Sequence, residues 1–310
     1  MRYINELTEG SRLQGVYYCK TKLCTETKNG KPYESLTLQD RTGTLDTKVW
    51  EPNSAGIGEY EAGDFIEVTG EVIVYNNAKQ AKLTRIRRAA EGEYDPADYM
   101  PVSKKSIPEM YDRLLKLVDS VGNTWLKELL ELFFQDESFA ADFKKSSAAK
   151  TVHHGFIGGL LEHSLSVAEL CDHMCTKYPI LNRDLLVTAA LLHDIGKTRE
   201  LSAFPENDYT DEGQLLGHIV IGAMMVGEKA DGIPNFPAQL KTDLEHCILA
   251  HHGELEFGSP KKPALIEALA LSMADNLDAK IETFTEILDN NNREGWMGFS
   301  KFLDSNLRRT

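Results

Sequence analysis

The spacing of apolar residues changes once along this chain of 310 residues, and that change most constrains how the chain can fold. Up to about residue 90, apolar and polar residues alternate in short stretches, as in residues 64–75. A period of two indicates strands with one buried face. After Ser106, apolar residues recur three and four positions apart to the end of the chain, which indicates amphipathic helices. The sequence therefore predicts a β-rich segment followed by a helical one.

The β-rich segment contains signals for about five short strands joined by tight turns. Asn29-Gly30 is a strong turn signal, Asp40 to Gly43 forms a second turn, and Asn76-Asn77 forms a third. Five short strands in about 80 residues favour a small closed barrel. The oligonucleotide-binding (OB) fold is the obvious candidate.

Residues 91–103 contain two prolines and no apolar period, which is typical of a linker. Beyond it, the main helices are expected at residues 160–174, 185–192, 215–227, 240–250 and 264–288. We therefore expect a multi-domain α+β protein, with a five-stranded OB-like barrel followed by an all-α domain. The expected divisions are residues 1–90 for the barrel, 91–150 for the linker and a helical connector, and 151–310 for the helical domain.

Composition and cysteine usage indicate a cytoplasmic protein. The chain is 42% hydrophobic and 26% charged, and it has no apolar run of the roughly 20 residues needed to span a bilayer. The first ten residues are polar and carry acids, unlike a signal peptide. The five cysteines form no recognisable disulfide framework. Cys171 and Cys175 lie four apart and are interpreted as one buried face of a helix rather than as metal ligands.

The net charge of −14 argues against a protein that coats nucleic acid with a broad basic surface. The charge is uneven, because residues 1–90 hold 13 basic and 12 acidic residues, whereas the remainder holds 21 and 36. A barrel of nearly neutral charge predicts moderate, salt-sensitive affinity for a nucleic acid.

All nine histidines lie between His153 and His252, and one of them forms a pair with an acid, His193-Asp194. This pair ends an apolar run over residues 185–192, where Gly196 is expected to stop the helix. A buried His-Asp pair is costly unless both groups are hydrogen-bonded or bound to a metal. Taken alone, the pair is equally compatible with a hydrogen bond in the core.

Other apolar helices also carry His or Asp, and independent core histidines should not concentrate in this way. The additional residues are His163, His218, His251, His252 and Asp275. Imidazole and carboxylate without thiolate suit Mn, Fe, Co, Zn or Mg. Seven ligands are too many for one open site and about right for two ions, because a carboxylate can bridge two metals that together activate water and neutralise a phosphoryl group.

The seven expected ligands divide into two sets that share Asp194. The first set is His163, His193, Asp194 and Asp275, and the second is Asp194, His218, His251 and His252. Lys197 lies just past the His-Asp pair and could hold a phosphate or the leaving group. Asp194 and Lys197 are therefore the expected catalytic residues, and His153-His154 are interpreted as lying at a helix start or on the substrate side.

The order His…His-Asp…His…His-His…Asp resembles that of the HD-domain superfamily of metal-dependent phosphohydrolases, over roughly residues 150–290. The resemblance implies an all-helical domain with these ligands, and His218 and His251-His252 resemble its two-metal members. Cyclic-dinucleotide phosphodiesterases of the HD-GYP type need a Gly-Tyr-Pro soon after the His-His pair. This chain has Gly258-Ser259-Pro260 there, which counts against that activity.

An OB-like domain, a helical connector and an HD domain in this order resemble the YhaM family of bacterial 3′-to-5′ exoribonucleases over nearly the whole chain. Residues 158–167 and 251–260 support the resemblance. It implies release of nucleoside 5′-monophosphates from the 3′ end of single-stranded RNA, and often of DNA. It also implies two divalent ions, with Mn preferred and Co, Fe, Mg or Zn as alternatives.

The barrel segment offers the side chains that bind single strands, which are aromatic platforms with modest positive charge. The candidates are Tyr17, Tyr18, Lys20, Tyr33, Lys48, Trp50, Tyr75, Lys79, Lys82 and Arg85. The alternative interpretation is that half of the aromatic residues belong to the core and that the basic residues form a solvated face.

Two other functions are compatible with the sequence. One is an HD-type phosphohydrolase of free nucleotides, in which the barrel is a regulatory or oligomerisation module. The other is a non-catalytic binding protein with a structural metal. The sequence is also compatible with a homo-oligomer.

Overall fold

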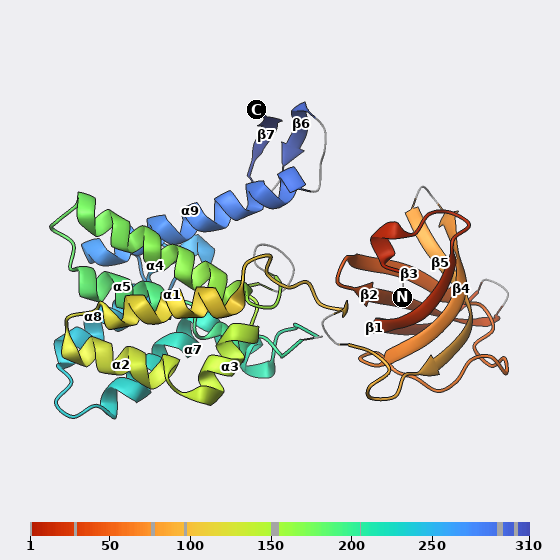
Figure 1. Ribbon diagram of the computed structural model, residues 1–310, viewed down its shortest axis with the longest axis horizontal. Helices are drawn as coiled ribbons and strands as arrows, with labels where there is room; N and C mark the ends of the chain where they lie inside the picture. The colour runs from red at the N-terminus through yellow and green to blue at the C-terminus, as the bar shows by residue number, and fades with distance from the viewer. Residues whose placement is uncertain are drawn as a thin grey trace. The chain divides into compact units, whose positions relative to one another are not determined.

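A computed structural model describes residues 2–27, 30–75, 78–95, 98–149, 155–204, 206–289, 294–300 and 303–310. The chain divides into two compact units (Figure 1). The first consists mainly of Met1–Val102, and the second of Ser103–Ala203 with Asn207–Thr310. The predicted turns at Asn29 and Asn76-Asn77, and the His153-His154 pair, lie outside the described residues.

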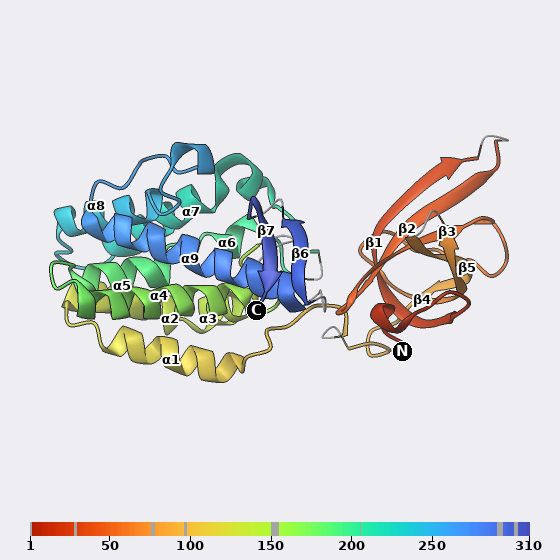
Figure 2. The same ribbon diagram turned by 90° about the horizontal axis from the view of Figure 1, so that it is seen from above.

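The first unit is a closed barrel of five strands. A short 3-10 helix, η1 (Ile4–Glu6), precedes them, and the strands are β1 (Arg12–Glu26), β2 (Pro32–Asp40), β3 (Gly43–Val49), β4 (Phe65–Tyr75) and β5 (Ala78–Arg88). They are hydrogen-bonded in the order β1-β2-β3-β5-β4, and β4 pairs with β1 to close the barrel (Figure 2). All pairs are antiparallel except β3 with β5. A closed five-stranded barrel with this order confirms the OB-like prediction.

Two of the aromatic residues predicted to bind nucleic acid are buried instead. Tyr17 is 0% exposed in the barrel core, where its hydroxyl donates a hydrogen bond of 2.6 Å to the carbonyl of Arg2. Tyr18 is 2% exposed and packs against Phe65. The prediction was wrong for both because three consecutive residues of β1, up to Cys19, are buried, just before a bulge that shifts the register of β1 against β2.

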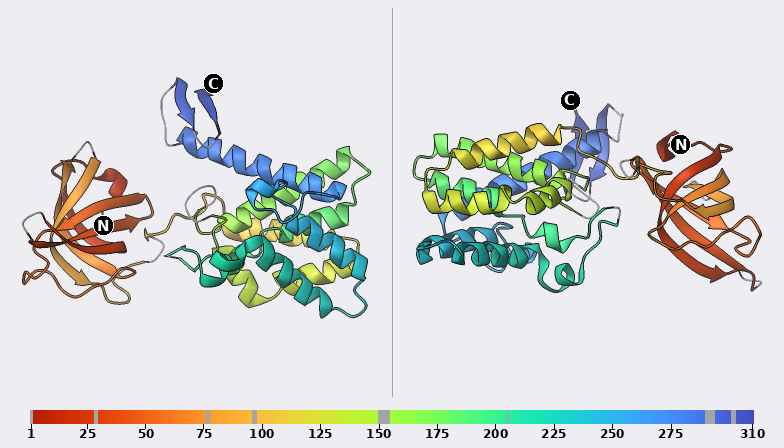
Figure 3. Two further views of the ribbon diagram at one scale, coloured as in Figure 1. Left: turned by 180° about the vertical axis from the view of Figure 1, so that it is seen from behind. Right: turned by 60° about the horizontal axis from the view of Figure 1, so that its bottom comes forward.

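The second unit packs its helices around one apolar core. The helices are α1 (Ile107–Asp119), α2 (Thr124–Phe134), α3 (Glu137–Lys145), α4 (Gly159–Lys177), α5 (Arg183–Leu192), α6 (Lys197–Glu200), α7 (Asp211–Asp231), α8 (Ala238–Leu249) and α9 (Ile266–Asp289), with η3 (Leu255–Phe257) before α9. Figure 3 shows them stacked side by side. Buried residues of α1, such as Leu114, belong to the same core as those of α4 and α5.

Local sequence explains where several of these helices begin. Ser106, Asn123, Asp136, Asn182 and Thr210 stand directly before α1, α2, α3, α5 and α7. Each side-chain oxygen accepts a hydrogen bond from a backbone N–H of the first turn, which otherwise has no partner within the helix.

The expectation that the chain is helical to its end was wrong for the last residues. A hairpin of β6 (Gly295–Ser300) and β7 (Ser305–Arg309) follows α9. Gly295 and Gly298 have positive φ angles, which a helix does not accommodate. Within the described part of the chain, no helix is both long enough and apolar enough to cross a membrane.

Candidate metal centre

The seven predicted ligands come from five different helices or their ends. His163 lies in α4, and Asp275 lies in α9. His193-Asp194 directly follow α5, and His251-His252 follow α8. His218 lies in α7, immediately after Gly217, whose φ of 72° breaks the helix into two parts. The helical unit brings all of them together, since neighbouring imidazole rings of the set lie 4.4–5.8 Å apart between centroids.

The donor atoms form two groups on either side of Asp194, and His193, Asp194 and His251 form a third group that joins them. One donor atom each of His163, His193 and Asp275 lie within 4.8 Å of one another, and so do those of His218, His251 and His252. Asp194 Oδ2 lies 3.5 Å from His163 Nε2 and 3.4 Å from His193 Nε2. Its other oxygen, Oδ1, lies 3.4 Å from His218 Nε2 and 3.6 Å from His251 Nε2. Each oxygen of Asp194 therefore faces one group.

Backbone carbonyl groups hold three of the imidazoles in a single tautomer. The Nδ1 atoms of His193, His251 and His252 lie 2.7–2.8 Å from the carbonyl oxygens of Ala190, Ile248 and Phe257. A carbonyl oxygen can only accept, so each Nδ1 carries the proton and donates it. Each Nε2 is then left with a lone pair, which is the form that binds a metal.

Carboxylates hold the other two imidazoles, and the sequence analysis missed both of these acids. His163 Nδ1 lies 2.8 Å from Asp278 Oδ2, and His218 Nδ1 lies 3.0 Å from Glu200 Oε1. Glu200 also accepts a hydrogen bond of 2.9 Å from the backbone N–H of His218. Asp278 could have been found from its spacing, because it stands one turn after Asp275 on the same helix face. Glu200 has no comparable signal.

The centre fits a divalent cation. Asp194 Oδ1, His218 Nε2 and His251 Nε2 are buried and have no hydrogen-bond partner among the described residues. Leaving such atoms unsatisfied costs about 1–3 kcal/mol each, whereas a bound cation would coordinate all three. The donors are imidazole and carboxylate without thiolate, which suits borderline and harder ions.

The electrostatics of the centre favour the metal-binding forms of two predicted ligands, His251 and Asp194. Burial lowers the pKa of His251 well below its ordinary value, so the ring is neutral. Burial would raise the pKa of Asp194, but the charge of Lys197 and the nearby histidines holds it well below its ordinary value. Lys197 Nζ donates a hydrogen bond of 2.5 Å to Asp194 Oδ2. The carboxylate is therefore ionised although it is only 1% exposed.

The expectation that Gly196 stops the helix was wrong, because α5 already ends at Leu192. The φ of −60° and ψ of −21° of Gly196 are right-handed, and this residue directly precedes α6. Its role is close packing, because a Cβ at this position would lie 2.1 Å from the carbonyl oxygen of His218. The glycine thus allows α7 to approach the His-Asp pair closely enough for His218 to join the centre.

A cavity of about 740 Å³ opens onto the centre. The predicted ligands His163, His251, His252 and Asp275 contribute to its wall, together with Lys197. His193 and Asp194 lie deeper, at 0% and 1% exposure. A substrate in the cavity could therefore reach His163, His251, His252 and Asp275 directly.

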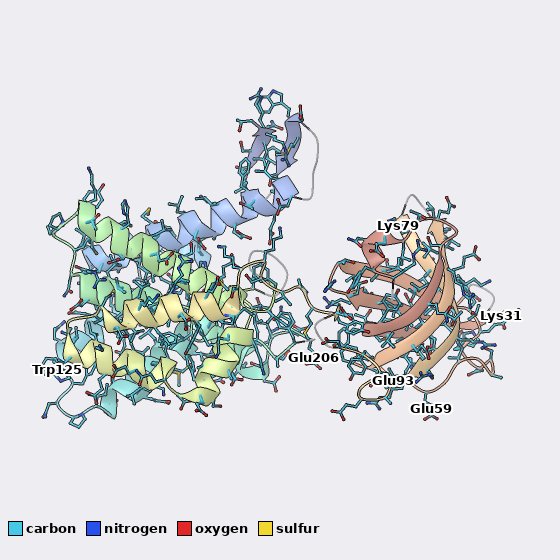
Figure 4. All side chains as sticks on the ribbon, in the orientation of Figure 1. Lys31, Glu59, Lys79, Glu93, Trp125 and Glu206 are labelled. Carbon is cyan, nitrogen blue, oxygen red and sulfur yellow. The ribbon has the colours of Figure 1, made fainter. Side chains whose placement is uncertain are left out.

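The barrel brings three of its predicted nucleic-acid-binding residues together. The rings of Tyr33 and Trp50 stack with centroids 5.0 Å apart, and Lys48 Nζ lies 5.5 Å from the centroid of Tyr33. Lys82 on β5 pairs in register with Lys48 on β3. The other exposed candidates are Lys20 on β1, Tyr75 at the end of β4, and Lys79 and Arg85 on β5 (Figure 4 labels Lys79).

Comparison with known proteins places the chain in a family. A family model described as "HD domain" matches residues 160–280. The chain is 34% identical over 276 residues to "3′-5′ exoribonuclease YhaM" of Bacillus velezensis, covering 88% of this chain and 86% of the relative. The chain belongs to the YhaM family. Relatives of the same name from Geobacillus sp. (35% identity, 84% of this chain and 80% of the relative) and Bacillus subtilis (34%, 84% and 82%) agree with this assignment.

Replacing Gly196 with alanine should displace α7. Because the new Cβ would clash with backbone rather than with a flexible side chain, we expect a loss of about 1–3 kcal/mol in the free energy of unfolding, together with weaker metal binding. Gly222→Ala is the matched control, since its Cβ would lie at 3.4 Å from Gly196 N, an ordinary contact. Chemical denaturation and metal titration measure both effects. Equal free energies of unfolding and equal metal affinities in the two variants would contradict the packing role of Gly196.

Replacing Asp278 with asparagine should lower metal affinity about 10–100-fold, as is typical when a partner that orients a metal-binding histidine is removed. The change leaves the size of the side chain almost unaltered but removes the charge that orients His163. Glu282→Gln, one turn further along α9, should bind metal like the wild type. Isothermal titration with Mn²⁺ provides the comparison, and equal affinity in all three proteins would exclude this role for Asp278.

Proposed function

We propose that this protein is a metal-dependent 3′–5′ exoribonuclease that degrades single-stranded RNA, and also single-stranded DNA, to nucleoside 5′-monophosphates. The observation that carries the proposal is the convergence of five imidazoles and two carboxylates at one cavity in a chain of the YhaM family. In such a reaction the bond between the phosphorus of the terminal nucleotide and the 3′ oxygen of the preceding ribose breaks. Water supplies the oxygen that stays on phosphorus.

We propose two divalent ions at the centre, Mn by preference, with Co, Fe, Mg or Zn as alternatives. The two groups of donor atoms on either side of Asp194 support this number. One ion would be held by His163, His193, Asp194 and Asp275, and the other by Asp194, His218, His251 and His252. When bound, such ions polarise the phosphodiester and lower the pKa of the attacking water.

Lys197 and Asp194 are the residues proposed to act next to the scissile phosphate. Lys197 lines the cavity, and its ammonium group contacts Asp194 at 2.5 Å. A phosphate oxygen entering the cavity would therefore meet a fixed positive charge. Asp194 would contribute one carboxylate oxygen to each donor group, because each of its oxygens faces one of them.

We propose a division of labour along the chain. Residues 1–90 would hold the upstream strand, residues 91–150 would form the linker and helical connector, and residues 151–310 would cleave the 3′ end. The stacked Tyr33–Trp50 pair beside Lys48 supports strand binding, because stacked aromatic rings and a nearby cation suit unpaired bases. Lys20, Tyr75, Lys79, Lys82 and Arg85 would add further contacts. All five cysteines are free thiols, which supports a cytoplasmic location.

A digest of 5′-labelled single-stranded RNA tests the proposed activity. With Mn²⁺ the wild type should shorten the RNA from its 3′ end, and EDTA should stop the reaction. His193→Ala should reduce the rate by more than the roughly 10–100-fold typical of losing an outer partner of a metal ligand. His173→Ala, which alters an exposed histidine of α4, should leave the rate unchanged. Intact RNA with Mn, Co, Mg and Zn, alongside hydrolysis of free nucleotides, would overturn the proposal.

The role of the barrel is tested by comparing an exposed aromatic residue with a buried one. Trp50→Ala should weaken binding of single-stranded RNA about tenfold, the scale of one lost stacking contact. Tyr17→Phe should keep wild-type affinity, although loss of its buried hydrogen bond lowers the free energy of unfolding by about 0.5–1.5 kcal/mol. Fluorescence anisotropy in EDTA measures binding without cleavage. Unchanged affinity in Trp50→Ala would rule out the stacking surface.

A further inference from the structure

The cavity above the metal centre has a second, apolar side that the proposed chemistry leaves unused. Phe257, Leu269 and Met273 line the same cavity as His251 and the other ligands. These three side chains are large, yet they are 67%, 49% and 55% exposed. Large apolar side chains around a binding cavity are typical of surfaces that a ligand covers.

Helix α9 explains how the two sides of the cavity arise. Successive residues of an α-helix are rotated by about 100°. On the face of α9 that lines the cavity, the middle is therefore formed by Ser272, Asn276 and Ala279. Asp275 lies on one flank of these three residues, toward His163. Leu269 and Met273 lie on the other flank. One helix thus supplies a carboxylate on one side of the cavity and an apolar surface on the other.

Phe257 connects the apolar side to the metal centre through its own backbone. Its carbonyl oxygen accepts the hydrogen bond from His252 Nδ1, while its side chain lines the cavity. The backbone of η3 that carries the aromatic ring is therefore hydrogen-bonded to a predicted ligand of the centre.

We propose that Phe257, Leu269 and Met273 form a binding surface for the 3′-terminal nucleobase of the strand. This inference rests on the proposed exonuclease function, in which the scissile phosphate belongs to the same terminal nucleotide. That nucleotide has a charged phosphate and an apolar base face, and the cavity offers a surface for each. Two hydrocarbon side chains and a thioether carry no strong hydrogen-bonding group to distinguish bases, so the surface accepts all four.

The test uses two 5′-labelled RNAs of the same sequence, one with an ordinary 3′-terminal nucleotide and one with an abasic ribose there. Removal of the first nucleotide is measured with Mn²⁺ at enzyme concentrations below saturation. The wild type should remove the abasic residue about tenfold more slowly, the scale of one lost base contact. The double variant Leu269→Ala/Met273→Ala should remove the ordinary nucleotide about tenfold more slowly than the wild type does. Its rate on the abasic RNA should stay close to that of the wild type. Saturating enzyme should restore most of the rate, because the lost contact acts in binding.

Leu277→Ala is the matched control, since Leu277 is also 49% exposed on α9 and is not among the described residues that line the cavity. It should retain the wild-type ratio between the two RNAs. Equal metal content and thermal unfolding in all variants show that the centre and the fold are intact. The proposed base-binding surface would be refuted if the double variant kept the wild-type ratio of the two removal rates. It would also be refuted if the wild type removed the ordinary and the abasic nucleotide at equal rates. Failure of the wild type to shorten either RNA would instead refute the exonuclease function.

Discussion

The helical unit depends on a carboxylate that is buried in its interior. Asp194 is 1% exposed, and an isolated ion in such a place would be far less stable than in water. Lys197 neutralises one of its oxygens, while the other has no hydrogen-bond partner among the described residues. The imidazole of the adjacent His193 and those of three further segments, α4, α7 and the end of α8, surround the carboxylate. The packing of α4, α5, α7 and α8 around one apolar core therefore determines the geometry of the centre, and a cation is the group that completes it.

Backbone geometry contributes as much to the centre as the choice of ligands. Three Nδ1 atoms donate to carbonyl oxygens, so the last turns of α5 and α8 direct the rings of His193 and His251, and the carbonyl of Phe257 in η3 directs that of His252. His218 reaches the centre because α7 is kinked at Gly217 and because Gly196 has no side chain to keep α7 away. Substitutions at such positions alter the centre without touching a ligand.

The sequence was sufficient to predict which His and Asp residues converge and to predict the barrel, because both leave strong local patterns. A His or Asp within an apolar helix is buried and needs a hydrogen-bond partner or a metal in the core. The positions of His163, His218 and Asp275 were predicted from this requirement. Carbonyl acceptors leave no pattern, and Glu200 is an ordinary acid until the fold brings it to His218. Tyr17 was misjudged because the register shift in β1 depends on its pairing with β2. The C-terminal hairpin was missed because its short strands carry little periodicity.

Charge determines which forces can hold a polyanion at the proposed site. The chain after residue 90 carries 21 basic and 36 acidic residues, so its long-range field repels RNA. In the proposed function, affinity would come from local contacts, which are the cations at the centre, Lys197, the apolar side of the cavity and the stacked rings of the barrel. Of these, only the charged contacts are strongly weakened by salt. Stacking and apolar contacts make no hydrogen bonds to the edges by which bases differ. An enzyme that relies on such contacts would degrade strands of any sequence.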